Sequence, residues 1–176
     1  VSLNRDKAKK QGFDELYTTI ENCAWFKENL PHDTKRRGEL YFPGKNILVE
    51  PTITSASGII SSNLLGCVID EADFLPKYAK SKQSFNMDGS YDLADDIYKN
   101  AVDRQISRYA SERGNPAKLI IASSARYPTS FTNRLISQFE TEGRIGKDVL
   151  VKRMPLWEAK PEGTFSKETF PVEIGD

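Results

Sequence analysis

The chain has 176 residues, of which 38% are hydrophobic and 10% aromatic, so it can bury one core of single-domain size. Its 25 basic and 25 acidic residues cancel, which excludes binding to nucleic acid through net charge and leaves only local patches for such contacts. No apolar run reaches the roughly 18 residues of a membrane-spanning helix, and no signal peptide is visible, so the sequence predicts a cytosolic protein.

Residues that bind metals through nitrogen or sulfur are few. Cys23 and Cys67 lie in apolar segments, and we expect both to be buried, reduced thiols. Their separation matches no zinc motif. His32 is the only histidine, so a two-histidine metal site is excluded.

The first part of the chain predicts a long helix followed by short strands. Residues 7–28 carry apolar side chains every three to four positions, which is typical of an amphipathic helix. Pro31 follows its end. Polar residues with glycine and proline predict loops over 32–46, around a short strand at 40–42, and residues 47–51 predict the next strand.

The middle of the chain alternates between strands and a helix. Residues 64–71 form a continuous apolar run that ends in two acids, as strands do when a parallel sheet is buried on both faces. Little periodicity over 76–90 predicts a mobile loop. An apolar face over 91–112 predicts a helix, and residues 117–122 predict another strand.

The last part adds a helix over 130–140 and a core strand over 148–151, before an irregular, proline-containing tail from Lys152. Because strands alternate with helices, we expect an α/β domain with a mainly parallel sheet flanked by helices. In such sheets ligands bind beyond the carboxyl ends of the strands.

The run Leu-Leu-Gly-Cys-Val-Ile-Asp-Glu at 64–71 has the Walker B pattern, an apolar strand that ends in two acids. The strand would fix both carboxylates on rigid backbone at the edge of the sheet. Asp70 can then hold Mg²⁺, mostly through water, and Glu71 can orient and polarise the water that attacks the γ-phosphate of ATP. The alternative is that both acids merely cap the segment that follows.

A second strand ends in small hydroxyl residues, Ser123 and Ser124, followed by Ala125. Motor ATPases often place such a segment beside the Walker B strand, where it senses the γ-phosphate and passes the change to DNA-contacting parts. The alternative is an ordinary junction between a strand and a turn. The separation from the Walker B strand fits one crossover helix, which favours the functional interpretation.

The order of these segments resembles the ATPase domain of the large terminase subunit of tailed bacteriophages. The resemblance covers most of the chain, and its order carries more weight than any one short motif. The segments that carry it are Gln11 with its helix, 47–51, Ser55 with 57–58, 66–72, 123–126, Phe131 with 134–135, and 154–161.

This resemblance implies an incomplete RecA-like P-loop NTPase core over residues 1–151, and a C-terminal segment over 152–176 that leads toward a linker. The cofactors would be ATP and Mg²⁺. The function implied is part of the packaging motor that drives double-stranded viral DNA into the procapsid. Arg126 or Arg134 would be candidates for an arginine that stabilises charge near the γ-phosphate.

The resemblance also implies the partners of such a motor. These are double-stranded DNA, the portal protein, the small terminase subunit and further copies of the same protein in a ring, assembled in the host cytoplasm without a membrane. Contacts to DNA would be mostly to phosphates and independent of sequence.

One departure concerns the phosphate-binding loop. No Gly-x-x-x-x-Gly-Lys-Ser/Thr segment occurs in the 176 residues, and the pairs at 44–45 and 146–147 lack the earlier glycine and the hydroxyl residue. The acidic cluster of the terminase nuclease is not identifiable either. Since the chain starts at Val1 without methionine and stops in an apolar stretch, we expect a piece of a longer protein that hydrolyses ATP negligibly by itself.

Two other functions remain open at this point. Asp70-Glu71-Ala72-Asp73 spells the box of the DEAD-box RNA helicases, although no Thr-Pro-Gly-Arg segment precedes it and Ser123 follows at a longer distance than those enzymes favour. Another P-loop motor belongs to the same alternative. The second is a non-catalytic, ATPase-like binding module, which the missing loop favours and the intact pair of acids disfavours.

Overall fold

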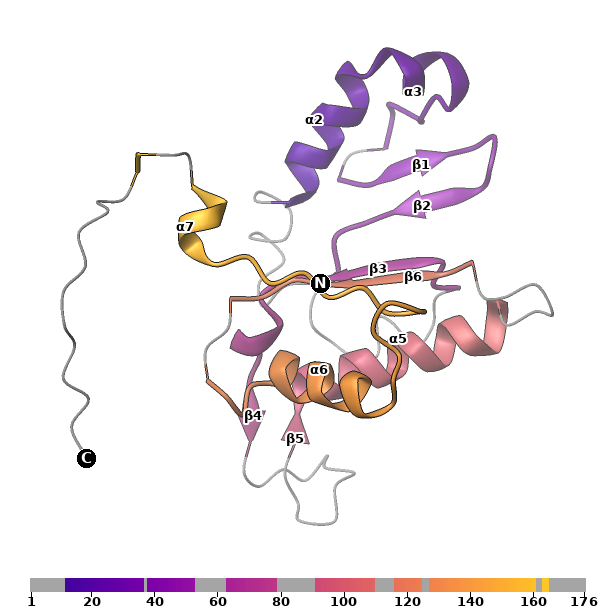
Figure 1. Cartoon of the computed structure of the whole chain (residues 1–176). Coiled ribbons are helices and arrows are strands. Elements are labelled where there is room, and N and C mark those ends of the chain that lie inside the picture. Colours follow the sequence, from indigo (N-terminus) through magenta and orange to yellow (C-terminus); the bar gives the residue numbers. More distant parts are fainter. Residues whose placement is uncertain are drawn as a thin grey trace, which may run out of the picture. The chain divides into compact units, whose positions relative to one another are not determined.

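The computed structural model describes residues 12–36, 38–52, 63–78, 91–109, 116–124, 127–160 and 163–164. The chain divides into two compact units, Val1–Leu135 and Ile136–Asp176, which are described separately. The architecture is mixed α/β, with helices and three two-stranded sheets among the described residues (Figure 1).

Two short helices open the described part of the first unit, α2 (Asp14–Asn22) and α3 (Ala24–Asn29). The sequence predicted one helix over 7–28, and the structure corrects this with a break at Cys23, whose backbone is extended. Asn22 donates its side-chain amide to the carbonyl of Thr18, a local bond typical of residues that weaken a helix. Residues 7–11 of the prediction lie outside the described residues.

The two strands predicted next are confirmed as β1 (Leu40–Phe42) and β2 (Ile47–Val49), which pair antiparallel. Asn46 closes the turn between them with a positive φ of 51°, a conformation that asparagine tolerates better than most residues. The hairpin packs on the helices in one core cluster. The buried members of this cluster are Phe13, Ile20, Leu40 and Phe42.

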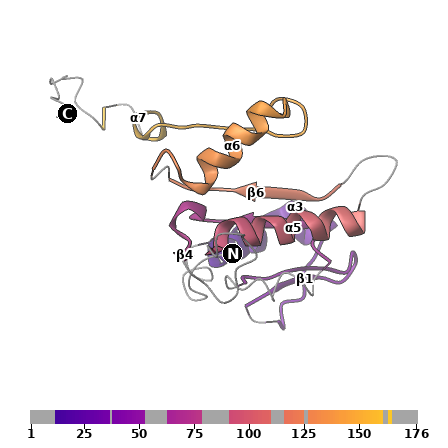
Figure 2. The same ribbon diagram turned by 90° about the horizontal axis from the view of Figure 1, so that it is seen from below.

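Two strands pair parallel, β3 (Gly66–Ile69) and β6 (Lys118–Ile121), which confirms both predicted strands. The predicted crossover helix is α5 (Leu93–Tyr109). It runs alongside β6 in Figures 1 and 2, and the Gln105 side chain donates to the Lys118 carbonyl at 3.0 Å.

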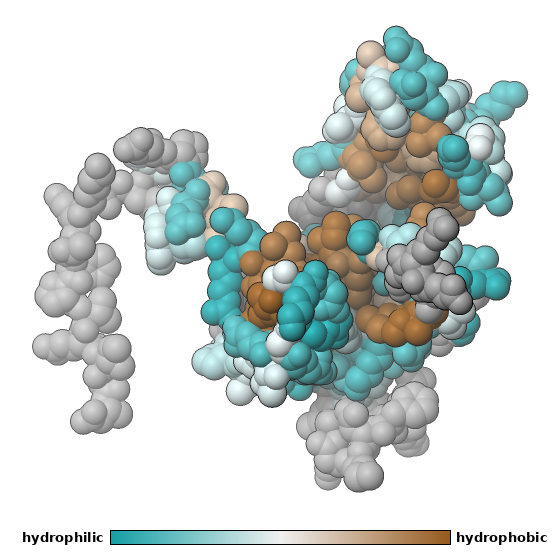
Figure 3. All heavy atoms as spheres, turned by 45° about the vertical axis from the view of Figure 1, so that its right-hand side comes forward, coloured by the Kyte–Doolittle hydropathy of each residue, from teal (hydrophilic) through white to brown (hydrophobic). Residues whose placement is uncertain are grey.

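Side chains of the parallel pair alternate between a buried and an open face. Cys67 and Ile69 of β3 are buried, whereas Val68 is 52% exposed and Ile120 of β6 is 57% exposed. The expectation that these strands are buried on both faces is therefore wrong for this structure. Figure 3 shows hydrophobic residues, coloured brown, that are exposed on the face drawn there.

The segment after β3 forms the short 3-10 helix η2 (Ala72–Phe74), and then β4 (Lys77–Tyr78) pairs antiparallel with β5 (Tyr91–Asp92). The mobile loop predicted over 76–90 thus begins as a strand, and its residues 79–90 lie outside the described part. Only one of the three described strand pairs is parallel, so the expected mainly parallel sheet is met in part, and no RecA-like core is evident among the described residues.

The helix predicted over 130–140 is confirmed as α6 (Phe131–Thr141), whereas the strand predicted over 148–151 is wrong. A single bridge joins Ile145 to Val149, and Leu150 is 92% exposed. The cause is a tight turn in which the Gly146 amide donates to the Val149 carbonyl at 2.9 Å and Gly146 has a positive φ.

In the second unit, Arg144 closes the turn after α6. Its guanidinium lies over the Phe139 ring at 4.6 Å and pairs with Asp148 at 2.7 Å. The hydrogen bond from Arg144 lowers the pKa of the Asp148 carboxyl below its ordinary value. One further helical turn, α7 (Leu156–Ala159), follows. None of the described helices is both long and apolar enough to cross a bilayer.

Candidate functional site

Asp70 and Glu71 lie directly beyond the carboxyl end of β3, and both are exposed. The Asp70 carboxylate accepts a hydrogen bond from the Glu71 amide at 3.0 Å. Glu71 itself has φ 52° and ψ 39°, the left-handed conformation, which costs a residue other than glycine on the order of 1 kcal/mol. The chain therefore turns sharply at the second acid of the predicted Walker B pair.

The carboxyl end of β6 meets this turn, as the predicted parallel pairing requires. The Ala122 amide donates to the Ile69 carbonyl at 2.9 Å, and the Ala72 amide donates back to the Ala122 carbonyl at 3.3 Å. One residue later, the Ser123 hydroxyl accepts a hydrogen bond from the Asp73 amide at 3.0 Å. The structure thus brings Ser123 to the segment that carries Asp70 and Glu71.

The remaining residues predicted for coupling are only partly described. Ser124 is exposed, and its carbonyl accepts a bond from the Ser123 hydroxyl at 3.4 Å. Ala125 and Arg126 lie outside the described residues. The coupling role of this segment stays a prediction, and the proximity of Ser123 to the turn after Glu71 is the part that the structure supports.

Asp73, which the sequence marked only as the last residue of a possible DEAD box, also lies at this site. It is only 6% exposed, and its carboxylate accepts hydrogen bonds from Thr132, from the amide at 2.8 Å and from the hydroxyl. Thr132 lies in the first turn of α6. An acid inside the otherwise apolar segment Ala72–Leu75 was the one available signal, because a buried carboxylate needs partners elsewhere in the fold.

Arg134, one of the two candidate arginines, is held by a different acid. Its guanidinium pairs with the Asp92 carboxylate at 2.6 Å, and Lys77 pairs with the same oxygen at 3.1 Å. The other Asp92 oxygen accepts from the Ala94 amide at 3.1 Å, at the start of α5. Within the described residues, no ion pair joins Arg134 to Asp70 or Glu71, so its role near a phosphate stays a prediction.

We expect Asp92→Ala to lower the free energy of unfolding by about 2 kcal/mol, because it removes a helix cap and two ion pairs at once. Asp92→Asn should cost about half as much, since asparagine also caps helices and loses only the charge. Urea unfolding of both variants measures the difference. Equal losses would contradict the assignment of the cap to Asp92.

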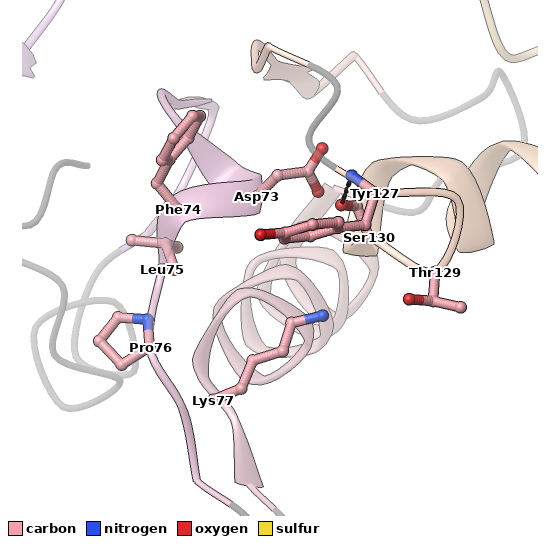
Figure 4. A pocket seen from close by; sticks show the side chains of 8 residues that line it. All are labelled: Asp73, Phe74, Leu75, Pro76, Lys77, Tyr127, Thr129 and Ser130. Atoms are coloured by element: carbon pink, nitrogen blue, oxygen red, sulfur yellow. Dashed lines mark hydrogen bonds between the residues drawn. The ribbon is translucent and has the colours of Figure 1, made fainter. Parts of the chain in front are cut away.

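A shallow hollow of about 350 Å³ lies beside the site (Figure 4). Its lining consists of Asp73, Phe74, Leu75, Pro76, Lys77, Tyr127, Thr129 and Ser130. Figure 4 shows the Lys77 ammonium and the Tyr127 ring at its border, with the Tyr127 amide donating to the Ser130 hydroxyl at 2.9 Å. Asp70 and Glu71 are not part of the lining, so the hollow does not coincide with the predicted nucleotide site.

The described residues offer too few ligands for a metal ion held by protein alone. They suit Mg²⁺ better, because this ion keeps several water ligands. Among the residues that the structure describes, no three or more potential histidine, cysteine, aspartate or glutamate ligands gather in one place. Mg²⁺ at nucleotide sites takes one or two carboxylates and completes its shell with water and phosphate oxygens. The exposed carboxylate of Asp70 fits that role.

The cysteines and the histidine take no part in this site. Cys67 is buried in β3, and burial raises the pKa of its thiol. Cys23 is only half-buried, so the expectation of buried thiols holds in full for Cys67 alone, and both cysteines are free. The ring of His32 packs edge-on against Tyr17 at 5.4 Å, as part of the packing of the N-terminal segment.

Comparison with known proteins identified no relative. No family model matches the chain, and neither a curated protein nor a solved structure is significantly similar to it.

Proposed function

We propose that this chain is part of an ATP-hydrolysing motor of the large-terminase kind, which drives double-stranded viral DNA into a procapsid. The observation that carries the proposal is the junction of β3 and β6. Two adjacent parallel strands end together, and the acids follow one strand while hydroxyl residues follow the other. Ligands of parallel α/β sheets bind at this edge.

In this proposal each residue at the edge has a separate task. Asp70 holds the Mg²⁺ of Mg²⁺-ATP, and Glu71 orients and polarises the water that attacks the γ-phosphate. Ser123, Ser124 and Ala125 pass the loss of the γ-phosphate on to the parts that grip DNA. The required partners are double-stranded DNA, the portal protein, the small terminase subunit and further copies of the protein in a ring.

The open face of the parallel pair also supports the proposal. Parallel sheets occur almost only where helices cover both faces, and Val68 and Ile120 of this pair expose apolar side chains. A RecA-like core supplies further strands and helices for such a face. The phosphate-binding loop, absent from the 176 residues, would belong to the same core.

One contact favours a second candidate, a helicase-like motor. The Asp70–Asp73 tetrapeptide matches the DEAD box, and the Asp73 amide binds Ser123, so that the last residue of the box touches the hydroxyl segment. The nucleic acid that stimulates ATP turnover separates the two motors. A packaging motor responds to double-stranded DNA, whereas an RNA helicase responds to single-stranded RNA.

The test compares the 176-residue chain with a polypeptide in which a phosphate-binding loop precedes it. We expect negligible Mg²⁺-dependent phosphate release from the chain alone, because nothing in it matches the lysine and backbone cradle of that loop. With the loop, we expect turnover that double-stranded DNA stimulates. Clear turnover by the chain alone that Glu71→Gln abolishes would refute the first expectation.

The same measurement tests the two alternatives. Stimulation by single-stranded RNA rather than DNA would support the helicase. Failure to bind Mg²⁺-ATP even with the loop present would leave a non-catalytic binding module.

A further inference from the structure

Asp73 joins three segments that are far apart in the sequence. Its backbone amide binds the hydroxyl of Ser123 at the end of β6. Its carboxylate binds the amide and the hydroxyl of Thr132 in the first turn of α6. Its own segment, η2, follows Glu71 directly. One buried residue thus connects the exit of β3, the exit of β6 through its backbone amide, and the start of α6 through its carboxylate.

The contacts of Asp73 reach Glu71 through the backbone. The Phe74 amide donates to the Glu71 carbonyl at 2.9 Å and closes the 3-10 turn in which Asp73 lies. Glu71 holds a left-handed conformation, and such a conformation persists only where surrounding contacts determine it. Asp73 anchors the turn that follows Glu71 directly.

We propose that Asp73 is a positioning residue, which fixes the left-handed backbone of Glu71 and links it to Ser123 and to α6. A displacement of Ser123 or of the first turn of α6 then changes the direction in which the Glu71 carboxylate is presented. The catalytic consequence rests on the proposed function, whereas the structural link does not. The competing explanation is that Asp73 only caps α6.

Ser130 supplies a matched control, because it contributes to the same helix start without touching the β3 turn. Its hydroxyl accepts from the Tyr127 amide at 2.9 Å, and its carbonyl accepts from the Arg134 amide at 3.0 Å. Ser130→Ala therefore weakens the entry to α6 and leaves the contacts of Asp73 in place. If Asp73 only stabilises α6, Asp73→Ala and Ser130→Ala should have the same effect on Glu71.

The first test uses NMR of the chain itself, with the Cα and Cβ shifts of Glu71 reporting its backbone conformation. We expect Asp73→Ala to move these shifts away from left-handed values and to speed amide exchange at Phe74 by about tenfold or more. Asp73→Asn should restore both, since the amide oxygen can accept from the Thr132 amide while the amide nitrogen donates to the Thr132 hydroxyl. Ser130→Ala should leave the Glu71 shifts unchanged.

Thr132→Val provides a milder variant in case Asp73→Ala does not fold. It removes the hydroxyl bond and keeps the amide bond, so we expect a smaller shift of Glu71 in the same direction. Unchanged Glu71 shifts in Thr132→Val and in folded Asp73→Ala would overturn the proposal. Equal shifts in Asp73→Ala and Ser130→Ala would also overturn it.

The second test measures turnover in the polypeptide that includes a phosphate-binding loop. We expect Asp73→Ala to lower kcat about tenfold or more with little change in KM, because misplacement of a catalytic group affects the transition state. Asp73→Asn should recover most of kcat. If the polypeptide with the phosphate-binding loop and the unaltered Asp73 shows no turnover at all, the proposed function fails, and the NMR result alone decides the role of Asp73.

Discussion

Glu71→Gln is expected to lower Mg²⁺-dependent ATP turnover by at least about 100-fold in a polypeptide that carries the phosphate-binding loop. Glutamine has nearly the same shape as glutamate, so the left-handed turn and its bond to Phe74 should persist. What is lost is the negative charge that, in the proposed mechanism, polarises the attacking water. Nucleotide affinity should change little, because the proposed metal ligand, Asp70, is unaltered.

Steady-state phosphate release gives the turnover, and titration with a fluorescent ATP analogue gives the affinity. Glu28→Gln is the matched control, since Glu28 is exposed on α3, outside the predicted site. The control should retain full turnover. Full turnover by Glu71→Gln would remove Glu71 from the mechanism, while loss of affinity without loss of kcat would make it a binding residue.

The sequence predicted the elements that bring the site together. Continuous apolar runs identified β3 and β6, and an apolar helical face identified α5; a helix was also predicted where α6 lies. Because parallel strands joined by one crossover helix end at the same edge of a sheet, the meeting of Ser123 with the segment after Glu71 followed from the order of elements.

Other features depend on tertiary contacts that no local pattern reveals. The bonds from Thr132 to Asp73 join residues on η2 and α6, and nothing in either segment identifies the other as its partner. The left-handed backbone of Glu71 is likewise unfavourable locally, so propensity alone predicts against it.

Two predicted elements were wrong because they were based on the positions of apolar residues and not on the backbone conformation. The break at Cys23 interrupts a stretch whose apolar spacing continues on both sides of it. The apolar residues at 149–151 suggested a core strand, but the glycine turn at Gly146 reverses the chain and leaves Leu150 in solvent. In both places the spacing of apolar residues indicates which side chains can be buried. The backbone conformation then determines whether these side chains are buried.

Phe131→Ala is expected to lower the free energy of unfolding by about 3–5 kcal/mol, the usual cost of removing a buried aromatic ring. Phe131 is 2% exposed and begins α6. Its ring lies 6.0 Å from the ring of Tyr98 on α5, at an interplanar angle of 60°. Urea unfolding measures the loss, and Trp25→Ala is the control, because Trp25 is 58% exposed on α3 and should cost about 1 kcal/mol or less.

Phe131 is next to Thr132 in the first turn of α6, so we also expect their substitutions to be coupled. The ring packs the start of α6 against α5, and the neighbouring threonine binds Asp73 in the turn after Glu71. If both contacts hold the same helix start, Phe131→Ala and Thr132→Val should be coupled, by about 0.5 kcal/mol or more in a double-mutant cycle. Strict additivity would mean that α5 and the turn after Glu71 hold α6 independently, and that packing of the core does not set the position of Glu71.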